Sequence, residues 1–514
     1  MASFWCGSCC IALLSIGSLG FSNATADTIS NSVGGNWSDA GTWTPAVVPN
    51  NTAGQSFDVS IGSTGGVTLN TNPTINSLTL AGPLSTGFYP PFGGTTPLGF
   101  TSLTVNGNVN VTASGTMGNA SSAPFDDSLG VGGNLTNAGF LYMTRGLSVT
   151  GNMNNAGTLS VGYPDPSLST MRGLLPYNAT PFTSLGGLAN SGTITFQGGT
   201  ATIGTKGNTI LNTGSLSVGA LFNAPATITV PGDFSNSGSV VLGTNGAGFG
   251  SGPFGTSTLN VEGTFINQPT GTLTINNPKS PFYNGPSMGV LQAQTLVNYG
   301  TMTIPTYSPT TVGQLENGGT LNVFGDAPGG AGRLTVNTLK LNAGGAITVW
   351  NQGGVLTVGS GMAPAGFEGY YQSADGMLEY AGGSLLIQDP ASLDGTLDIM
   401  LGDGYKPAGT IFDVLQADGT VTGVFSNVEG LVFDGGQEKY VLGYTGGYEV
   451  TLTVENNATP EPGSVFLVLL GFMGILAIGA ARKRSRRYCA PSNLLGSACI
   501  EHVGTGNTGA FIWS

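Results

Sequence analysis

The chain has 514 residues, of which only 8% are charged, and it carries a net charge of −13. Its few basic residues ahead of the C-terminal tail are scattered and form no basic patch, so nucleic acid is not an expected partner. The five cysteines lie close to the two ends, and the single histidine is His502. These counts exclude a disulfide framework, a Cys or His metal site and a histidine-dependent catalytic triad from the body of the chain.

The first segment, residues 1–26, is predicted to be a secretory signal peptide. An apolar run over residues 11–21 ends near Ala24-Thr25-Ala26, which has the small-x-small spacing of a cleavage site. No Lys or Arg precedes the run, which departs from the usual positively charged start. The alternative is that the run is a buried core segment of the folded protein.

Residues 27–56 are predicted to form an N-terminal cap. The segment Gly35-Asn36-Trp37 resembles the opening of many secreted bacterial repeat proteins, and a second tryptophan, Trp43, follows it. A column of stacked coils needs cover at its end, because the terminal coil exposes apolar side chains and unpaired strand edges. Covering that coil is the expected role of the two rings, and an aromatic sugar-binding platform is the alternative.

Residues 57–383 are predicted to be a β-solenoid with Gly/Pro-rich insertions, within an all-β fold. Between residues 147 and 161, apolar residues alternate with small polar ones on either side of Gly151-Asn152 and Asn155-Ala156-Gly157. The alternation is typical of strands, and the corner residues are able to take positive φ at little cost. Imperfect copies predict stacked coils about 4.8 Å apart that enclose their aliphatic residues in a long rod. The copies are residues 129–141, 228–242 and 259–275.

Two features of the repeats have expected structural roles. Asn recurs at one corner of the coils, where stacked side-chain amides would form a ladder of hydrogen bonds. Segments rich in Gly, Pro and aromatic residues are expected to project from one corner, either as decoration or as a binding face. The asparagines are Asn137, Asn155, Asn190, Asn212, Asn236, Asn267, Asn298 and Asn317, and the segments are residues 82–99, 163–187, 243–257 and 276–289.

Residues 384–456 are predicted to be a C-terminal β cap, because acidic residues become more frequent there and the strands are more clearly delimited. Residues 409–415 and 423–428 resemble the closing β segment of autotransporter-like secreted repeat proteins. This resemblance implies a cap that is polar on its outer face.

Residues 457–487 resemble the PEP-CTERM sorting tail of bacterial exported proteins. The motif Pro460, Glu461, Pro462 is followed by an apolar run over residues 465–481, which is about long enough to cross a bilayer as one helix. A basic cluster follows, and the positive-inside rule predicts that such a cluster stays in the cytoplasm. The cluster consists of Arg482, Lys483, Arg484, Arg486 and Arg487.

The resemblance of this tail implies recognition by an exosortase, cleavage near the Pro-Glu-Pro motif, and release to the cell surface or the extracellular matrix. An ordinary membrane anchor is the alternative. Similar tails also carry the label of an ice-binding protein C-terminal domain, which says little about the body. Residues 488–514 continue beyond the basic cluster as an atypical extension, which departs from the family pattern.

The acids within the repeats do not predict a catalytic site. β-Solenoids include polysaccharide lyases and glycoside hydrolases, whose sites need carboxylates gathered on one face of neighbouring coils. Asp126 and Asp127 would point to opposite faces of a strand, and Asp233 occupies a corner position that indicates a turn residue. The remaining coil acids are Asp165, Glu262 and Glu316.

A calcium site and an ice-binding or sugar-binding face are two further hypotheses. Asp394, Asp398 and Asp403 lack the spacing of a recognised calcium loop, so a solvated surface is their expected role. Ice or sugar binding would need Thr-x-Thr pairs on one flat exposed face, and Thr is also a common outward residue of strands. The pairs are Thr193/Thr195, Thr200/Thr202, Thr227/Thr229, Thr272/Thr274 and Thr301/Thr303.

The sequence therefore predicts a secreted, surface-sorted structural or adhesive protein rather than an enzyme. Its expected partners are an exosortase-type sorting enzyme, exopolysaccharide or a cell surface, and at least transiently the membrane. No cofactor and no metal is expected. Repeated faces of Ser, Thr and Asn would supply many weak contacts that add through avidity. The alternatives are a carbohydrate-active β-helix enzyme, either a lyase or a glycoside hydrolase, and an ice-binding protein.

Overall fold

The computed structural model describes most of the chain between residues 26 and 456. The signal peptide, the sorting tail and the C-terminal extension lie outside the described residues. The chain divides into two units, Met1–Glu455 and Asn456–Ser514, and the fold below is that of the first. The gaps within the described part are residues 32, 64, 87–100, 119–126, 144–145, 163–181, 220–224, 244–254, 276–287, 305–308, 327–329, 332, 351–353, 360–368, 402–407 and 434–437.

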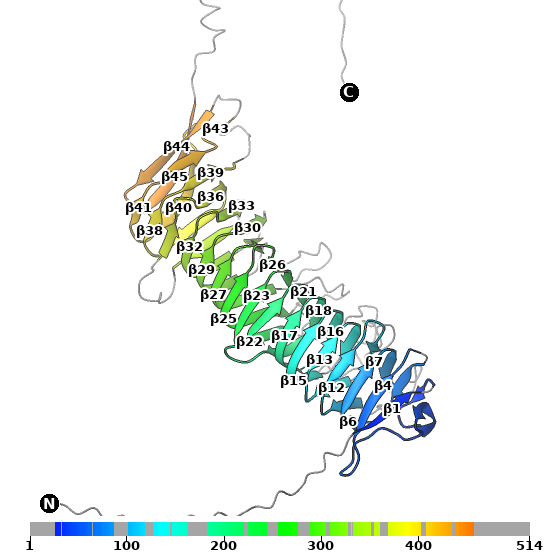
Figure 1. The fold of residues 1–514 in the computed structure, drawn as a ribbon. Helices are drawn as coiled ribbons and strands as arrows, with labels where there is room; N and C mark the ends of the chain where they lie inside the picture. Colours follow the sequence, from blue (N-terminus) through cyan, green and yellow to red (C-terminus); the bar gives the residue numbers. More distant parts are fainter. Residues whose placement is uncertain are drawn as a thin grey trace, which may run out of the picture. The chain divides into compact units, whose positions relative to one another are not determined.

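The described residues form coils whose strands pair in parallel with the equivalent strands of the coils before and after them, in three ladders. The strands follow one another in chain order, from β1 in blue to β45 in orange (Figure 1). Such in-register parallel stacking makes this part of the chain a β-solenoid, as the sequence predicts. A few longer strands bend and contribute their first half to ladder 1 and their second half to ladder 2.

Ladder 1 consists of β6 (Thr74–Ile75), β9 (Thr101–Val105), β12 (Asp127–Val131), the first halves of β15 (Gly146–Asn155) and β17 (Phe182–Asn190), β19 (Gly199–Ile203), β22 (Ala226–Val230), the first halves of β25 (Thr256–Asn267), β27 (Met288–Asn298), β29 (Pro309–Asn317) and β32 (Arg333–Leu341), β34 (Val355–Val358), β37 (Ser384–Ile387) and β40 (Ile411–Ala417).

Ladder 2 consists of β1 (Asp27–Asn31), β4 (Phe57–Ile61), β7 (Ser77–Leu80), β10 (Val109–Val111), β13 (Leu135–Asn137), the second halves of β15 and β17, β20 (Thr209–Asn212), β23 (Asp233–Asn236), the second halves of β25, β27, β29 and β32, β35 (Gly369–Gln372), β38 (Ala391–Leu393) and β41 (Val421–Gly423).

Ladder 3 forms a separate sheet. It consists of β2 (Gly35–Asn36), β5 (Val67–Leu69), β8 (Pro83–Thr86), β11 (Thr116–Met117), β14 (Phe140–Met143), β16 (Thr158–Gly162), β18 (Thr193–Gln197), β21 (Ser215–Gly219), β24 (Ser239–Leu242), β26 (Thr272–Ile275), β28 (Thr301–Ile304), β30 (Thr320–Asp326), β33 (Ala346–Trp350), β36 (Met377–Ala381), β39 (Thr396–Ile399) and β42 (Asn427–Glu429).

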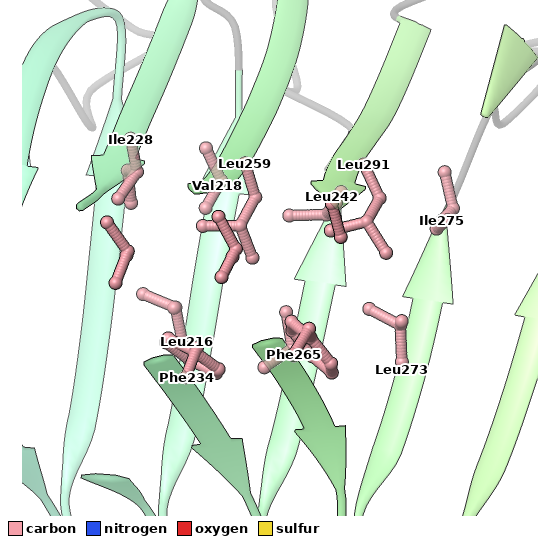
Figure 2. Packing of buried hydrophobic residues seen from close by; sticks show 14 of the residues in the cluster. Leu216, Val218, Ile228, Phe234, Leu242, Leu259, Phe265, Leu273, Ile275 and Leu291 are labelled. Carbon is pink, nitrogen blue, oxygen red and sulfur yellow. The ribbon is translucent and has the colours of Figure 1, made fainter. Parts of the chain in front are cut away.

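The strands alternate inward apolar residues with outward polar ones, and the inward residues of the three ladders share one core. Leu147, Val149, Leu159 and Val161, the residues that first indicated the repeat, are all at most 2% exposed. Figure 2 shows how Leu216 and Val218 of ladder 3 meet residues such as Ile228 of ladder 1 and Phe234 of ladder 2 in the interior. Stacking each coil on the next buries these side chains, which a single coil could not do.

The predicted amide ladder is confirmed. In each coil from β13 to β27, the corner Asn donates from Nδ2 to the Oδ1 of the corner Asn in the next coil, at 2.7–2.8 Å. Each Nδ2 also donates to a backbone carbonyl of that next coil, for example from Asn236 to Thr272 at 3.1 Å. The ladder runs from Asn137 to Asn317, where Nδ2 of the last Asn donates to the carbonyls of Gly319 and Ala346. Burial of these amides costs little because their donors are satisfied within the column.

The corner glycines do not use the positive φ that glycine can adopt. None of the glycines quoted for the corners, such as Gly151 and Gly157, has φ in the left-handed region. Instead, a Cβ on Gly157, Gly192, Gly214 or Gly238 would overlap the carbonyl oxygen of the corner glycine in the preceding coil. These residues are glycine because the backbones of successive coils approach closely at the corner.

The N-terminal end is covered as the sequence predicts. Trp37 and Trp43 are 0% and 2% exposed, and their rings pack edge to face with centroids 4.9 Å apart. Trp37 Nε1 donates to the carbonyl of Pro49, and Trp43 Nε1 donates to the carbonyl of Trp37, both at 2.9 Å. A short 3-10 helix, η1 (Ala40–Thr42), leads into β3 (Trp43–Thr44), which pairs antiparallel with β1. The burial of both rings contradicts the alternative of a sugar-binding platform.

The C-terminal cap is shorter than residues 384–456. The parallel ladders continue beyond residue 384 through β37–β42. Antiparallel strands cover the end of ladder 1, where β45 (Glu449–Asn456) pairs with β40, while β43 (Val432–Phe433) pairs with β44 (Glu438–Thr445). The rise in acidic residues reflects outward positions of the last coils as well as the cap itself, so composition alone misplaces this boundary.

The four predicted insertions enter and leave the coils at one junction. The gaps 87–100, 163–181, 244–254 and 276–287 each follow a strand of ladder 3 and precede a strand of ladder 1. A small antiparallel pair, β31 (Gly330–Ala331) with β30, lies at the same junction. The described residues thus confirm that these segments depart from one corner, while the segments themselves lie outside the described part. Among the described residues, no helix has the length and apolar character needed to cross a bilayer.

Candidate functional site

The predicted sorting residues lie outside the described part of the chain. These are Pro460, Glu461 and Pro462 of the motif, and Arg482, Lys483, Arg484, Arg486 and Arg487 of the basic cluster. The apolar run over residues 465–481 lies outside it as well. Membrane crossing and sorting therefore remain predictions.

Among the described residues, the acidic side chains of the coils do not gather into a group that could form a catalytic site. Asp233 is the first residue of β23 rather than a turn residue, and its Oδ1 accepts a hydrogen bond of 2.8 Å from the backbone N–H of Thr264 in the next coil. Glu316 accepts from Nε2 of Gln314 at 3.2 Å, and Glu262 is exposed. Asp126 and Asp165, and the side chain of Asp127, lie outside the described part.

Three carboxylates stack in the last coils, although this arrangement was not predicted from the sequence. Glu379 pairs in register with Asp398, and Asp398 with Glu429, on the outer face of ladder 3. Burial, followed by the charges of Glu379 and Glu429, raises the pKa of Asp398. Thr348 donates to Glu379, and Asn427 donates to Glu429 at 2.9 Å, so this acid column is a line of neighbouring like charges with local partners.

No metal site is evident among the described residues: no three His, Cys, Asp or Glu side chains are grouped so that they could hold an ion. Of the residues considered for calcium, Asp394 accepts from the backbone N–H of Gly395 at 2.7 Å. Asp398 belongs to the acid column, and Asp403 lies outside the described part. Asp394 and Asp398 therefore have different neighbours and do not share a site.

The Thr-x-Thr pairs lie on two faces rather than one. Thr200/Thr202 stack directly on Thr227/Thr229 on ladder 1. The other pairs lie on the outer face of ladder 3, where Thr272/Thr274 stack on Thr301/Thr303. On that face, one outward column carries a hydroxyl in every coil from β16 to β30, namely Thr158, Thr193, Ser215, Ser239, Thr272, Thr301 and Thr320.

A shallow open groove of about 770 Å³ crosses the outer face of ladder 2 from β10 to β20. Its floor is the in-register column Asn110, Thr136, Asn154, Ala189 and Leu211. A second row of amides, including Asn108, Asn134 and Asn152, lines the groove at the corner between ladders 1 and 2. We call this feature the amide groove.

The amide groove was not predicted from the sequence, although the sequence contains a signal for it. Gly107-Asn108-Val109-Asn110, Gly133-Asn134-Leu135-Thr136 and Gly151-Asn152-Met153-Asn154 repeat the same order of glycine, amide, apolar residue and polar residue. Alternation places the second polar residue of each copy on the outer face. The sequence pattern does not show that these copies are aligned side by side in space, so the groove could not be predicted from it.

Comparisons with known proteins add no relative: no family model matches the chain, and neither the search of curated proteins nor that of solved structures found a match.

Proposed function

We propose that this protein is a secreted, surface-sorted structural or adhesive β-solenoid that associates with extracellular polysaccharide. The observation that carries the proposal is the repetition of uncharged hydrogen-bonding groups in register on the outer faces of the coils. The hydroxyl column on ladder 3, from Thr158 to Thr320, is the longest example. A repeated face suits a repeated partner, because each coil presents the same group at the same spacing of about 4.8 Å.

The mechanism is additive. A single Ser, Thr or Asn contact exchanges a hydrogen bond to water for one to a sugar hydroxyl, so each contact contributes little. Many such contacts on one rigid surface act together, because binding of the first segment holds the next one close to its own site. The satisfied amide ladder beneath the surface keeps the spacing of the coils fixed.

The sorting part of the proposal is supported by the sequence. Pro460-Glu461-Pro462, the apolar run and the basic cluster occur in the order of a PEP-CTERM tail. In the proposed sequence of events, the signal peptide directs export and the apolar run halts in the membrane. An exosortase then cleaves near the motif and releases the solenoid to the surface or matrix. The proposed role is not enzymatic.

Expression of the full chain in its native host tests the proposal. We expect the surface or matrix fraction to contain protein whose C-terminus, mapped by mass spectrometry, lies near Pro460-Glu461-Pro462. A matched variant, Glu461→Gln, should remain in the membrane fraction with the basic cluster intact. Finding the unmodified protein in the cytoplasm would refute export, and an intact basic cluster on surface protein would indicate an anchor instead of sorting.

Ice binding is the second candidate, favoured by the stacked pairs Thr272/Thr274 and Thr301/Thr303. The second outward column of ladder 3 is less regular, since Val241 and Asn322 interrupt its hydroxyls. An assay of thermal hysteresis separates the two candidates. We expect no hysteresis from the unmodified protein; a clear signal that Thr301→Val abolishes would replace the adhesive proposal with ice binding.

A further inference from the structure

We propose that the amide groove on ladder 2 binds a segment of a neutral polysaccharide as an extended chain. The inference rests on the proposed function and assigns it to one surface. The amide groove is distinct from the hydroxyl column, which lies on ladder 3.

The shape of the groove follows from small residues in one coil. Gly187 and Ala189 of β17 stand between Asn152 and Asn154 of β15 on one side and Thr209 and Leu211 of β20 on the other. Where neighbouring coils carry an amide or a leucine, β17 carries a hydrogen or a methyl group. The surface is therefore hollowed at this coil, and the groove runs along the stack from β10 to β20, about 19 Å for four coil spacings.

The lining retains spare hydrogen-bonding capacity. The side chains of Asn110 and Asn154 are exposed and make no hydrogen bond within the described part of the chain. Asn108 and Asn134 use only Oδ1, which accepts from the backbone N–H of Asn134 and Asn152 at 2.8 and 2.9 Å. Their NH₂ groups point to no described partner, so both donors and acceptors are available, as vicinal sugar hydroxyls require.

The charge and the apolar area of the groove restrict the class of ligand that it can bind. None of the described residues that line the groove is ionisable at neutral pH, which disfavours anionic chains, nucleic acids and strongly charged peptides. Leu211 is 47% exposed at one end of the floor, and Ala189 is exposed beside it. A sugar ring presents C–H faces to such apolar area and hydroxyl edges to amides, the mixture of contacts on which ligand sites rely.

The groove is open to a polymer along the axis of the coils. Between β10 and β20, the segments 119–126, 144–145 and 163–181 each follow a strand of ladder 3 and precede a strand of ladder 1, whereas the groove lies on ladder 2 and its junction with ladder 1. The parallel strand pairing of ladder 2 is unbroken from β10 to β20, and the buried amide ladder stabilises it from β13 onward. A chain longer than the groove can therefore extend beyond both of its ends.

Calorimetric binding to the full chain, solubilised in mild detergent, tests the proposal. The probes are neutral hexasaccharides of glucose, xylose and mannose, with oligogalacturonate and an uncharged extended peptide of similar length for comparison. We expect at least one neutral hexasaccharide to bind. Ala189→Arg, which fills the hollow, should weaken that binding at least tenfold, and Asn154→Ala should weaken it about threefold to tenfold. Val424→Arg, at a 58% exposed position that belongs to neither the amide groove nor the hydroxyl column, is the matched control and should bind like the unmodified protein.

Three results would overturn the inference: no neutral hexasaccharide binds, Ala189→Arg binds as well as Val424→Arg, or the acidic oligosaccharide or the peptide binds more tightly. Unchanged melting of each variant establishes that loss of binding is not loss of fold. The proposed function fails separately. If Ala189→Arg loses hexasaccharide binding while the unmodified protein is never exported, the groove is a polysaccharide site but the proposed function at the cell surface is refuted. If cells carrying Ala189→Arg keep the protein in their matrix, another face is responsible.

Discussion

The central coils and the two ends of the solenoid share the same parallel strand pairing but fill the same corner position differently. From β13 to β29, the inward corner residue of ladder 2 is always an asparagine, joined to the next by a buried hydrogen bond. Toward the N-terminus the register carries Ile61, Leu80 and Val111, and toward the C-terminus Leu341 follows Asn317. Beyond Leu341 the same register carries Gln372, a fully buried amide that bonds to a tyrosine hydroxyl and to two backbone carbonyls. A buried amide at this corner therefore needs satisfied partners, and only in the central coils does a neighbouring asparagine supply one.

The ends also differ from the centre in how their open strand edges are covered. At the N-terminus, two buried tryptophans and a very short antiparallel strand close the column. At the C-terminus, β45 covers β40 but the last strand of ladder 3 ends in Glu429, within the acid column. A charge on a short edge strand discourages pairing with another chain, so the two ends use different means against aggregation.

Removing a ring from the N-terminal cap should have the largest effect. Trp37→Ala deletes a fully buried indole and its hydrogen bond to Pro49, so we expect a loss of about 4 kcal/mol in the stability of the first coils. Hydrogen exchange is the appropriate measurement, because solenoid coils can open locally. Amides of β1 and β4 should exchange faster while those of β25 stay protected; equal exchange across all coils would show that cap and centre unfold as one unit.

Breaking the amide ladder should have the second largest effect on stability. Asn236→Ala removes the acceptor of Asn212 Nδ2 and the donor to Asn267 Oδ1 and to the Thr272 carbonyl, so we expect a loss of about 3 kcal/mol. Asn154→Ala, an exposed amide one residue before a ladder asparagine, should cost less than about 0.5 kcal/mol. The comparison is made by urea unfolding monitored by circular dichroism. Similar losses in the two variants would mean that the ladder does not distinguish the central coils.

Substitution of two glycines distinguishes the cost of a close backbone contact from the cost of a strained backbone conformation. Gly214→Ala places a Cβ against the carbonyl of Gly192 in the preceding coil, and we expect a loss of about 2–3 kcal/mol. Gly207 has φ of 88° with open space around it, so Gly207→Ala should cost only about 1 kcal/mol through the strained φ. Thermal unfolding of both variants measures the difference, and the reverse order would contradict our account of the corner.

The acid column should give the smallest effect and a pH signature confined to the C-terminal end. The pKa of Asp398 is raised above its ordinary 3.8, so the folded protein holds this proton more strongly than the unfolded chain does. The free energy of unfolding therefore falls as pH rises from 3.8 through the raised pKa, and the penalty persists at neutral pH. Asp398→Asn should remove that slope and stabilise the protein at pH 7 by about a few tenths of a kcal/mol.

The control for this prediction is Glu379→Gln, which removes one of the charges that raise the pKa of Asp398. NMR titration of the Asp398 carboxyl should then give a lower pKa than in the unmodified protein. No change in that pKa would mean that the neighbouring acids do not interact, despite their pairing in register.

Much of the architecture was predictable from sequence because it depends on local periodicity. Alternation at Leu147, Val149, Leu159 and Val161 identified inward residues correctly. The two N-terminal tryptophans and the corner asparagines were also assigned to their observed roles. The predicted position of the C-terminal cap was wrong, and the close backbone approach that requires the corner glycines was not predicted. Both depend on contacts between coils that local composition does not report.

The alignment of distant coils is what the tertiary structure alone decided. The sequence determined which residues face inward, because strand alternation is a property of a few consecutive residues. Successive corner asparagines, however, are separated by anything from 18 to 35 residues, since insertions of unequal length lie between them. No fixed period therefore relates Glu379 to Asp398 and Glu429, or Asn154 to Ala189 and Leu211. Only the pairing of backbones brings these side chains into the acid column and the amide groove.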